Sequence, residues 1–319
     1  MAKQCTIPSF QTQFKVTVIG AGNVGATAAY AMLMDGTPTE LVLIDRNKEK
    51  AEGLVLDMEH SMAFFDYTRV VGTDDYAAAR NSHLVVITAG ARQQPGETRL
   101  DLIAKNRAIL KDIAGKILKV APKAIFVIVS NPVDVLTYEF YKMSKLPWGR
   151  VFGTGTLLDT ARLRFHLSEQ LCLNAKSIEA FILGEHGDTS FPVWSSANVA
   201  GRPLAKMPGF TKSMANTAYK DTREAAYRII HDVGYTCYSI GTVIKEIMVH
   251  VFQHSRIVLP LSIPLEKGHS FGGIEGVALS VPCVLDSTGV TQLIELPFNA
   301  VEKKQLKKSA ATLKSYLKK

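Results

Sequence analysis

The amino-acid sequence predicts an α/β protein in which a doubly wound parallel sheet is followed by an α+β domain. Three observations indicate this fold. Apolar strands alternate with helices through the first half, a glycine-rich turn joins the first strand to the first helix, and the alternation ends near residue 153. The chain has 319 residues, whereas a single core stops growing at about 250–300 residues. We therefore expect two domains, over residues 1–153 and 154–319.

The first half contains four continuous apolar segments with the composition of buried strands. They are residues 15–20, 40–45, 83–90 and 124–130. Helices are expected between them, at about 23–34 and 48–60 and in the long segment that ends before Pro122. Parallel strands that helices cover on both faces lack the polar alternation of half-exposed strands. The pattern therefore predicts a doubly wound parallel sheet.

The second half has a different order of elements. A helix is expected at about 157–172 and a strand at 177–184, followed by long helices over 212–253 and shorter strands over 256–296. Helices and strands are grouped here rather than alternating, which is typical of an α+β domain.

The net charge of +8 raises the question of a nucleic-acid partner. Many of the lysines lie in residues 303–319, where they alternate with leucines at helical spacing and form the solvated face of an amphipathic helix. These lysines have a single aromatic residue among them, Tyr316, and not the interleaved aromatic series that a base-stacking surface would require. We therefore expect no nucleic-acid partner, and the surplus charge would instead attract anionic ligands.

The cysteines and the apolar segments bear on the cell compartment. The cysteines are scattered, at Cys5, Cys172, Cys237 and Cys283, without the paired spacing of a zinc site. The first 14 residues lack the apolar run of a signal peptide, and no segment approaches the roughly 20 apolar residues that cross a bilayer. We expect a soluble, cytoplasmic protein without a metal and without a membrane partner.

The turn after the first strand matches a dinucleotide-binding pattern, because residues 20–25 read GAGNVG and Asp45 ends the next strand. The glycines allow a tight turn and close approach of a pyrophosphate, and the following helix offers its N-terminal amides. Asp45 would accept hydrogen bonds from ribose hydroxyls and repel a 2′-phosphate, which favours NAD, although the neighbouring Arg46 leaves NADP open. The predicted cofactor-binding residues of this segment are Gly20, Gly22, Asn23, Val24, Gly25 and Asp45.

A candidate acid–base group lies in the second half. His186 stands between glycines in a predicted loop, where it has room for a ligand. Asp159 and Arg162 are three residues apart on one predicted helix and leave it on the same face. A buried aspartate can fix the tautomer of an imidazole and raise its pKa. Arg162 is then available to bind a substrate carboxylate through two parallel hydrogen bonds.

From about residue 14 onward the chain resembles the lactate/malate dehydrogenase superfamily, and within it the bacterial L-lactate dehydrogenases. The motifs are GAGNVG, ITAGARQQPGETR, VSNPVD, LDTAR, GEHGD and the closing segment GGIEGVALSVPCVL, together with the terminal helix. The resemblance implies a Rossmann-type NAD-binding domain followed by a substrate domain, conversion of a 2-keto acid to a 2-hydroxy acid, and a homotetramer.

The resemblance also implies roles for single residues. Residues 91–99 look like a loop that closes over the substrate, with Arg99 polarising the substrate carbonyl. Asn131 is similar to the family's residue beside substrate and nicotinamide, and the proline after it is expected to be cis. Thr236 would border the substrate pocket, and Ile240 would pack under the nicotinamide ring.

These roles predict that His186 protonates the ketone oxygen while NADH gives a hydride to the carbon. The malate enzymes of the superfamily carry arginine where this chain has Gln93. The second carboxylate of oxaloacetate would lack a counter-charge beside Gln93, so pyruvate and L-lactate are the expected substrates, with malate dehydrogenase as the alternative. A protein that had kept only the fold would be expected to lack at least one of the four groups His186, Asp159, Arg99 and Arg162, which are all present.

A regulatory expectation comes from a departure from the family pattern. Many bacterial relatives are activated by fructose 1,6-bisphosphate, which an arginine and a histidine bind at a subunit interface. Arg164 matches the arginine and points about 200° away from Arg162 around the helix, whereas Glu179 stands at the histidine position. A carboxylate there would repel a phosphate and could pair with Arg164. We therefore expect no activation by this sugar bisphosphate.

Overall fold

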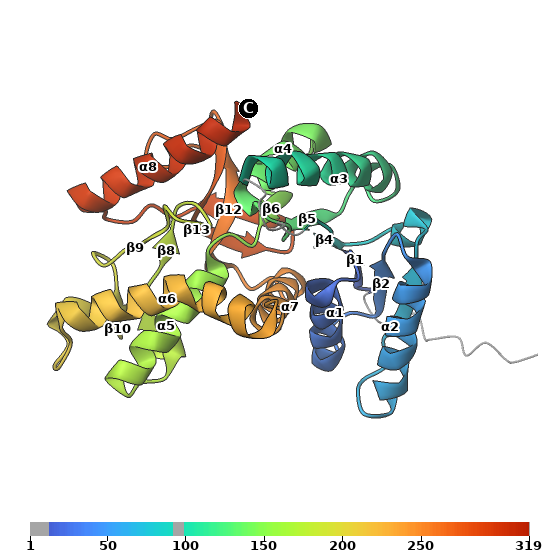
Figure 1. Cartoon of the computed structure of the whole chain (residues 1–319), viewed down its shortest axis with the longest axis horizontal. Coiled ribbons are helices and arrows are strands. Elements are labelled where there is room, and N and C mark those ends of the chain that lie inside the picture. The colour runs from blue at the N-terminus through green and yellow to red at the C-terminus, as the bar shows by residue number, and fades with distance from the viewer. Residues whose placement is uncertain (1–12, 92–98, 319) are drawn as a thin grey trace, which may run out of the picture.

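The computed structural model describes residues 13–91 and 99–318, with only the backbone of Arg99. The first-half strands are β1 (Lys15–Ile19), β2 (Glu40–Ile44), β3 (Arg69–Thr73), β4 (Leu84–Ile87), β5 (Ile125–Ile128) and β6 (Val151–Gly153). They pair in parallel in the order β3-β2-β1-β4-β5-β6 (Figure 1). The predicted doubly wound parallel sheet is confirmed, although the sequence analysis did not anticipate β3 and β6 as strands.

Helices cover both faces of this sheet, as the continuous apolar strands predict. They are α1 (Asn23–Asp35), α2 (Lys48–His60), α3 (Arg99–Val120) and α4 (Val133–Ser144). Alternate residues of β1 enter different core clusters. Val16 and Val18 pack in the cluster that includes Met32 of α1, whereas Ile19 packs in the cluster that includes Phe140 of α4. Both faces of the sheet are therefore buried.

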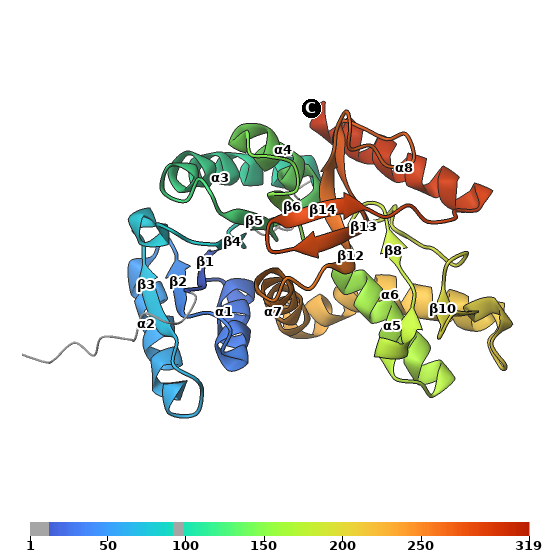
Figure 2. The same cartoon turned by 180° about the vertical axis from the view of Figure 1, so that it is seen from behind.

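The second half extends the same sheet. Its larger elements are α5 (Leu157–Leu171), α6 (Lys212–Val233), α7 (Tyr238–Phe252), β12 (Ile257–Leu265), β13 (Val277–Asp286), β14 (Gly289–Leu293) and α8 (Ala300–Leu317). β12 runs antiparallel to β6, with Ser262 opposite Gly153, and continues into β13 and β14 (Figure 2). The expectation of shorter strands over 256–296 was wrong for β12 and β13, which have 9 and 10 residues. Their prolines interrupt the apolar pattern, yet Pro260 and Pro282 lie opposite each other in register without ending either strand.

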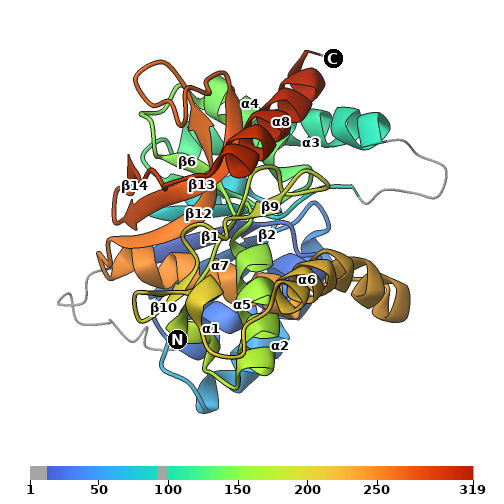
Figure 3. The ribbon, with the colours of Figure 1, turned by 90° about the vertical axis from the view of Figure 1, so that its left-hand side faces the viewer.

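The single strand expected at 177–184 is also wrong, because the structure has two short strands there, β7 (Ile178–Glu179) and β8 (Ile182–Leu183). β7 pairs with β10 (Asn198–Val199), whereas β8 pairs with β9 (Phe191–Pro192). Between them the carbonyl of Ala180 accepts a hydrogen bond of 3.0 Å from Nε of Arg164 instead of from a strand. The chain thus leaves one sheet and enters a hairpin, which has α8 on one side and α5 and α6 on the other (Figure 3).

Candidate active site

The cofactor-binding edge lies where the strand order reverses, between β1 and β4. Ligands of open α/β sheets bind at the carboxyl ends of the strands at such a point. The predicted cofactor residues lie at these ends: Gly20 follows β1, Asp45 follows β2, and Asn131 follows β5 after an intervening turn.

Two glycines of the turn are required by its geometry. Gly20 has a φ of +109°, and a Cβ on Gly25 would lie 1.8 Å from the carbonyl oxygen of Gly20. Gly22 is different, because a Cβ there would meet nothing within 4 Å. It also precedes α1 without a side-chain cap, so the first amides of the helix, from Asn23 and Val24, have no capping side chain. The turn therefore leaves a place for phosphates beside unbonded amides.

Asp45 is held by the same turn. Its Oδ2 accepts a hydrogen bond of 2.7 Å from the amide of Ala21, and its Oδ1 accepts one of 3.0 Å from the amide of Asn47. Each oxygen keeps a further lone pair for a ribose hydroxyl. Ile240 lies on α7, next to Gly241, which packs against Thr27 of α1. The residues present thus fit a dinucleotide.

The loop between β8 and β9 carries the predicted acid–base histidine. Gly184 at its start exchanges two backbone hydrogen bonds of 3.0 Å with Ser280 of β13. The amide of Glu185 donates to Oγ of Ser309 on α8 at 3.2 Å, and the amide of His186 donates to Oδ2 of Asp134 on α4 at 2.8 Å. Three separate elements therefore fix the backbone that leads to the imidazole.

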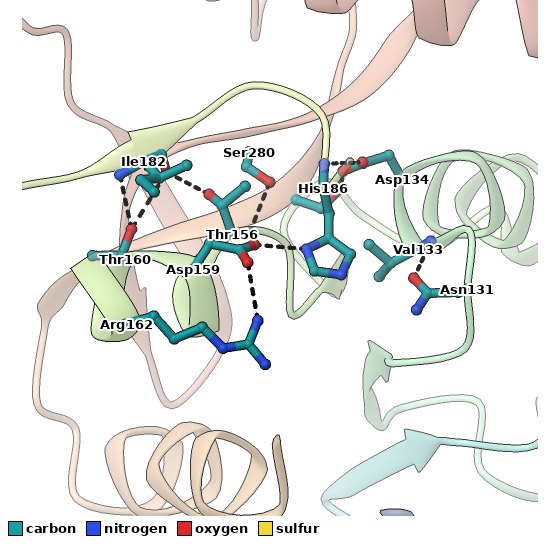
Figure 4. A network of polar contacts seen from close by, with 11 residues as sticks. Asn131, Val133, Asp134, Thr156, Asp159, Thr160, Arg162, Ile182, His186 and Ser280 are labelled. Atoms are coloured by element: carbon teal, nitrogen blue, oxygen red, sulfur yellow. Dashed lines mark hydrogen bonds and ion pairs between the residues drawn. The ribbon is translucent and has the colours of Figure 1, made fainter. Parts of the chain in front are cut away.

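The imidazole contacts the predicted aspartate, which in turn contacts the predicted arginine (Figure 4). Nδ1 of His186 lies 2.7 Å from Oδ2 of Asp159, and Oδ1 of Asp159 accepts a hydrogen bond of 3.3 Å from Arg162. Helix α5, which carries both partners, is tied to β8 because Thr156 and Thr160 hydrogen-bond the backbone of Ile182. The spacing of three residues along the helix places both side chains on one face, where Asp159 lies between His186 and Arg162.

The electrostatics favour an ion pair of imidazolium and carboxylate. Burial alone would lower the pKa of His186, but the charge and hydrogen bond of Asp159 raise it above its ordinary value. Burial would raise the pKa of Asp159, but His186 and then Arg162 lower it below the usual range. Asp159 therefore stabilises the protonated form of His186, a ring that can give up a proton and take it back.

These side chains line a cavity of about 450 Å³ together with Asn131. The structure thus brings Asn131, Asp159, Arg162 and His186 to one place. Thr236 lies in the turn before α7 and, like Ile240, does not line this cavity. Gln93 and the side chain of Arg99 lie outside the described residues.

Two family models match this chain. The NAD-binding domain of lactate/malate dehydrogenases matches residues 14–153, and the α/β C-terminal domain of the same enzymes matches residues 156–319. The chain belongs to the lactate/malate dehydrogenase family. It is an NAD-dependent oxidoreductase of that family, and the predicted NAD cofactor is confirmed.

Relatives from bacteria and animals match nearly the full chain. An L-lactate dehydrogenase of Thermoanaerobacter sp. is 40% identical over 95% of this chain and 98% of its own length, and L-lactate dehydrogenase 1 of Clostridium acetobutylicum is 41% identical over 95% and 97%. The L-lactate dehydrogenase B-A chain of Danio rerio is 43% identical over 96% and 92%. The crystal structure of a minor L-lactate dehydrogenase from Enterococcus mundtii has a TM-score of 0.92 and 37% identity, and the match covers 97% of this chain and 98% of that one. The resemblance inferred from the motifs is therefore confirmed.

The family's Asn-Pro motif has the expected backbone, since the Asn131–Pro132 bond is cis. Within residues 13–91 and 99–318, no group of three or more His, Cys, Asp or Glu could hold a metal ion, and no helix is long and apolar enough to cross a membrane.

Sequence reasoning missed two parts of this site. The first is Asp134, whose partner is a backbone amide 52 residues away and so leaves no pattern in the sequence. The second is one face of α6, which supplies Thr222, Arg223, Ala226, Tyr227 and Ile230 to the cavity wall. Their spacing of three and four residues was the available signal, but it marks a helix face without saying what the face lines.

Proposed function

We propose that this protein interconverts pyruvate and L-lactate, with His186 as the proton donor and acceptor. The observation that carries the proposal is the 2.7 Å contact between Nδ1 of His186 and Asp159 at the wall of the cavity. Asp159 fixes the tautomer and stabilises the imidazolium, which leaves Nε2 to give a proton to the keto oxygen of pyruvate or take one from the hydroxyl of lactate.

Arg162 binds the substrate carboxylate in this proposal. Its guanidinium lines the cavity while one nitrogen donates to Asp159, so its orientation is fixed before a substrate enters. Two parallel hydrogen bonds from the remaining donors would align the substrate, a geometry that lysine cannot reproduce. NADH, when bound at the β1–β4 edge, supplies the hydride.

Further residues complete the site. Asn131 lines the same cavity and would hydrogen-bond the substrate. We also propose, from the sequence, that Arg99 polarises the carbonyl when the segment 91–99 closes, that Thr236 borders the pocket, and that Ile240 packs beneath the nicotinamide.

Pyruvate rather than oxaloacetate is the proposed substrate because of Gln93. A neutral side chain leaves a second substrate carboxylate without a counter-charge in a closed pocket. The names of the relatives support this assignment. The test is NADH oxidation with each 2-keto acid in parallel. Higher kcat/KM with oxaloacetate would replace the proposal by its alternative, malate dehydrogenase.

We propose in addition that fructose 1,6-bisphosphate does not activate the enzyme. An oxygen of Glu179 lies 3.6 Å from a terminal nitrogen of Arg164, and the Arg164 guanidinium also lies over the ring of Phe181, 5.3 Å from its centre. Burial lowers the pKa of Arg164 and the charge of Glu179 opposes this. The carboxylate therefore supplies the negative charge that a phosphate would otherwise bring to this arginine.

The assembly and the cell compartment are also proposed. Large apolar side chains are exposed near the end of α2, at Leu56, Phe64 and Tyr67, and contact with further subunits of a homotetramer would cover such side chains. Light scattering after size exclusion would give the mass. We place the enzyme in the cytoplasm, where reduction of pyruvate regenerates NAD⁺ during fermentation. Fractionation of cells would test that placement.

A further inference from the structure

Arg223 is a cation in the wall of the substrate cavity that the proposed reaction does not use. It lies on α6, which packs against α5, the helix that carries the predicted aspartate and arginine (Figure 1). Together with Tyr227 it lines both the cavity and a smaller adjoining hollow of about 240 Å³. In the described part of the chain its guanidinium forms no ion pair with a carboxylate, and its printed contact is with an aromatic ring. Its charge therefore remains available to an anion in the cavity.

An anchored tyrosine supports this guanidinium. Arg223 lies over the ring of Tyr219, 5.8 Å from the ring centre. The hydroxyl of Tyr219 donates a hydrogen bond of 2.6 Å to the carbonyl of Ser190, which lines the same cavity. Burial raises the pKa of Tyr219, the charge of Arg223 lowers it, and the charge of Asp159 raises it. The charges of the outer arginine and of the buried aspartate thus both reach this ring.

The charges of the cavity wall show what Arg223 adds. Among the described residues that line the cavity, Asp159 and Asp188 are negative, while Arg162 and protonated His186 are positive. Arg162 also spends one donor on Asp159, at 3.3 Å. These four charges cancel in number, so Arg223 supplies the excess positive charge of the described lining. That excess equals the one negative charge that a monocarboxylate brings into the cavity.

We propose that Arg223 is a second cation of the substrate site, which attracts the substrate carboxylate through space while Arg162 binds it directly. The inference rests on the proposed function only for the identity of this anion. A through-space attraction depends on the charge at position 223 and on ionic strength, but not on the exact shape of the side chain. These two dependences distinguish it from a packing role of the arginine on Tyr219.

The main test changes the charge at position 223 in steps. KM for pyruvate should stay within about twofold in Arg223→Lys, rise roughly two- to fivefold in Arg223→Gln, and rise by a similar factor again in Arg223→Glu. We expect kcat to change by less than about twofold, because the carboxylate carries its charge in both the bound substrate and the transition state. Steady-state NADH oxidation gives both constants.

Ionic strength provides an independent measurement on the same variants. Raising it from about 0.01 M to about 1 M shortens the screening distance from roughly 30 Å to roughly 3 Å. The value of kcat/KM for pyruvate should fall over this range in the wild type and fall less in Arg223→Gln, which has one charge fewer to screen.

Arg228→Gln is the matched control on the same helix. Arg228 lies five residues after Arg223, about 140° further around the helix, and does not line the cavity. It is exposed and lies 3.8 Å from Asp232. Its loss removes an equal charge from the protein, yet KM for pyruvate should stay within about twofold of the wild-type value.

Three results would overturn the inference. An equal rise of KM in Arg223→Lys and Arg223→Gln would assign the effect to packing on Tyr219 and not to charge. An unchanged KM in both Arg223→Gln and Arg223→Glu would remove the effect altogether. A rise in Arg228→Gln as large as that in Arg223→Gln would reduce it to the net charge of the protein.

Binding of oxamate, an unreactive anion with the shape of pyruvate, separates this inference from the proposed function. Its Kd for the enzyme–NADH complex, measured by fluorescence titration, should increase in the same order of variants as KM. If oxamate binds in that order while the wild type does not reduce pyruvate, the proposed function fails and the inference stands. If all variants reduce pyruvate with the wild-type KM, only the inference fails. A wild-type protein that does not bind oxamate would overturn both.

Discussion

The two sides of this site are built from different materials. The cofactor side is made of backbone: one turn over residues 20–25, the amides that begin α1, and a carboxylate that the turn itself holds. The substrate side is made of side chains from β5–α4, α5, the β8–β9 loop and α6. The first is local in sequence and the second is assembled from segments far apart.

This difference indicates which side of the site can change its substrate specificity. A backbone site depends on close approach, so an added methyl group disturbs it, while most side chains nearby leave it unaffected. A site made of side chains can change its substrate or lose its chemistry through one substitution while the fold persists. The predictions below test this contrast, beginning with the largest expected effect.

Gln93→Arg should change the substrate preference and leave NADH binding unchanged. It supplies the counter-charge for a second carboxylate, whose burial unpaired costs several kcal/mol, so the ratio of kcat/KM for oxaloacetate to that for pyruvate should rise roughly 10³-fold. Steady-state NADH oxidation measures the ratio. Gln93→Leu is the matched neutral control. A change below about tenfold would show that another residue discriminates between the substrates.

His186→Gln should remove the chemistry and keep the cofactor. Loss of a general acid lowers turnover by about 10²–10⁴-fold. The Kd for NADH should remain near the wild-type value, because the hydrogen bonds that fix this loop go to Asp134, Ser280 and Ser309 and not to the glycine turn. Stopped-flow measurement of single turnovers would separate chemistry from product release. Equal loss of NADH binding would mean that the two sides are not independent.

Gly25→Ala should have the opposite pattern and weaken NADH binding. The new Cβ would lie 1.8 Å from the carbonyl oxygen of Gly20. Overpacking of this kind costs typically about 1–3 kcal/mol, which corresponds to roughly 5–150-fold in NADH affinity if the turn opens. Differential scanning calorimetry should show a lower Tm.

Gly53→Ala on α2 is the matched control, because its Cβ would meet nothing within 4 Å. It should leave both NADH affinity and Tm at or above the wild-type values, since alanine favours a helix interior. If Gly25→Ala behaved in the same way, the turn would not be the rigid element that we describe.

The same contrast explains which parts of the site could be predicted from the sequence alone. The glycine turn and Asp45 were predictable because their chemistry repeats at fixed spacing within one strand–helix–strand unit. Asp159 and Arg162 were predictable because one helix turn joins them. Asp134 was not, since its partner is a backbone amide, and the break between β7 and β8 was not, since it depends on Arg164 reaching a carbonyl 16 residues away.

Asp159→Asn should alter how the activity depends on pH. The pKa of His186 is raised above its ordinary value chiefly by Asp159, so its loss lowers that pKa. The fall of kcat/KM for pyruvate with rising pH should move down by about one unit or more, and lactate oxidation, which needs neutral His186, should extend to lower pH. Glu139→Gln, a half-buried carboxylate paired with Arg107, is the control. A larger shift in that variant would contradict the assignment.

Glu179→His should have the smallest effect on activity, and this effect should appear only when fructose 1,6-bisphosphate is added. In the wild type the carboxylate of Glu179 lies 3.6 Å from Arg164, so added fructose 1,6-bisphosphate should leave the pyruvate saturation curve unchanged. The substitution removes the repulsion, frees Arg164 and adds a cation at mildly acidic pH. Millimolar effector should then lower KM for pyruvate by roughly two- to tenfold, a modest coupling between two sites.

Glu179→Gln separates the two causes, because it frees Arg164 without adding a cation and should respond less than the histidine variant. The response of Glu179→His should also fade as the pH rises and the new imidazole loses its proton. A leftward shift of the wild-type curve on adding effector would show that the Arg164–Glu179 pair does not block the site. If the histidine variant does not respond either, a cation at position 179 is not sufficient, and this chain lacks further groups that bind the effector.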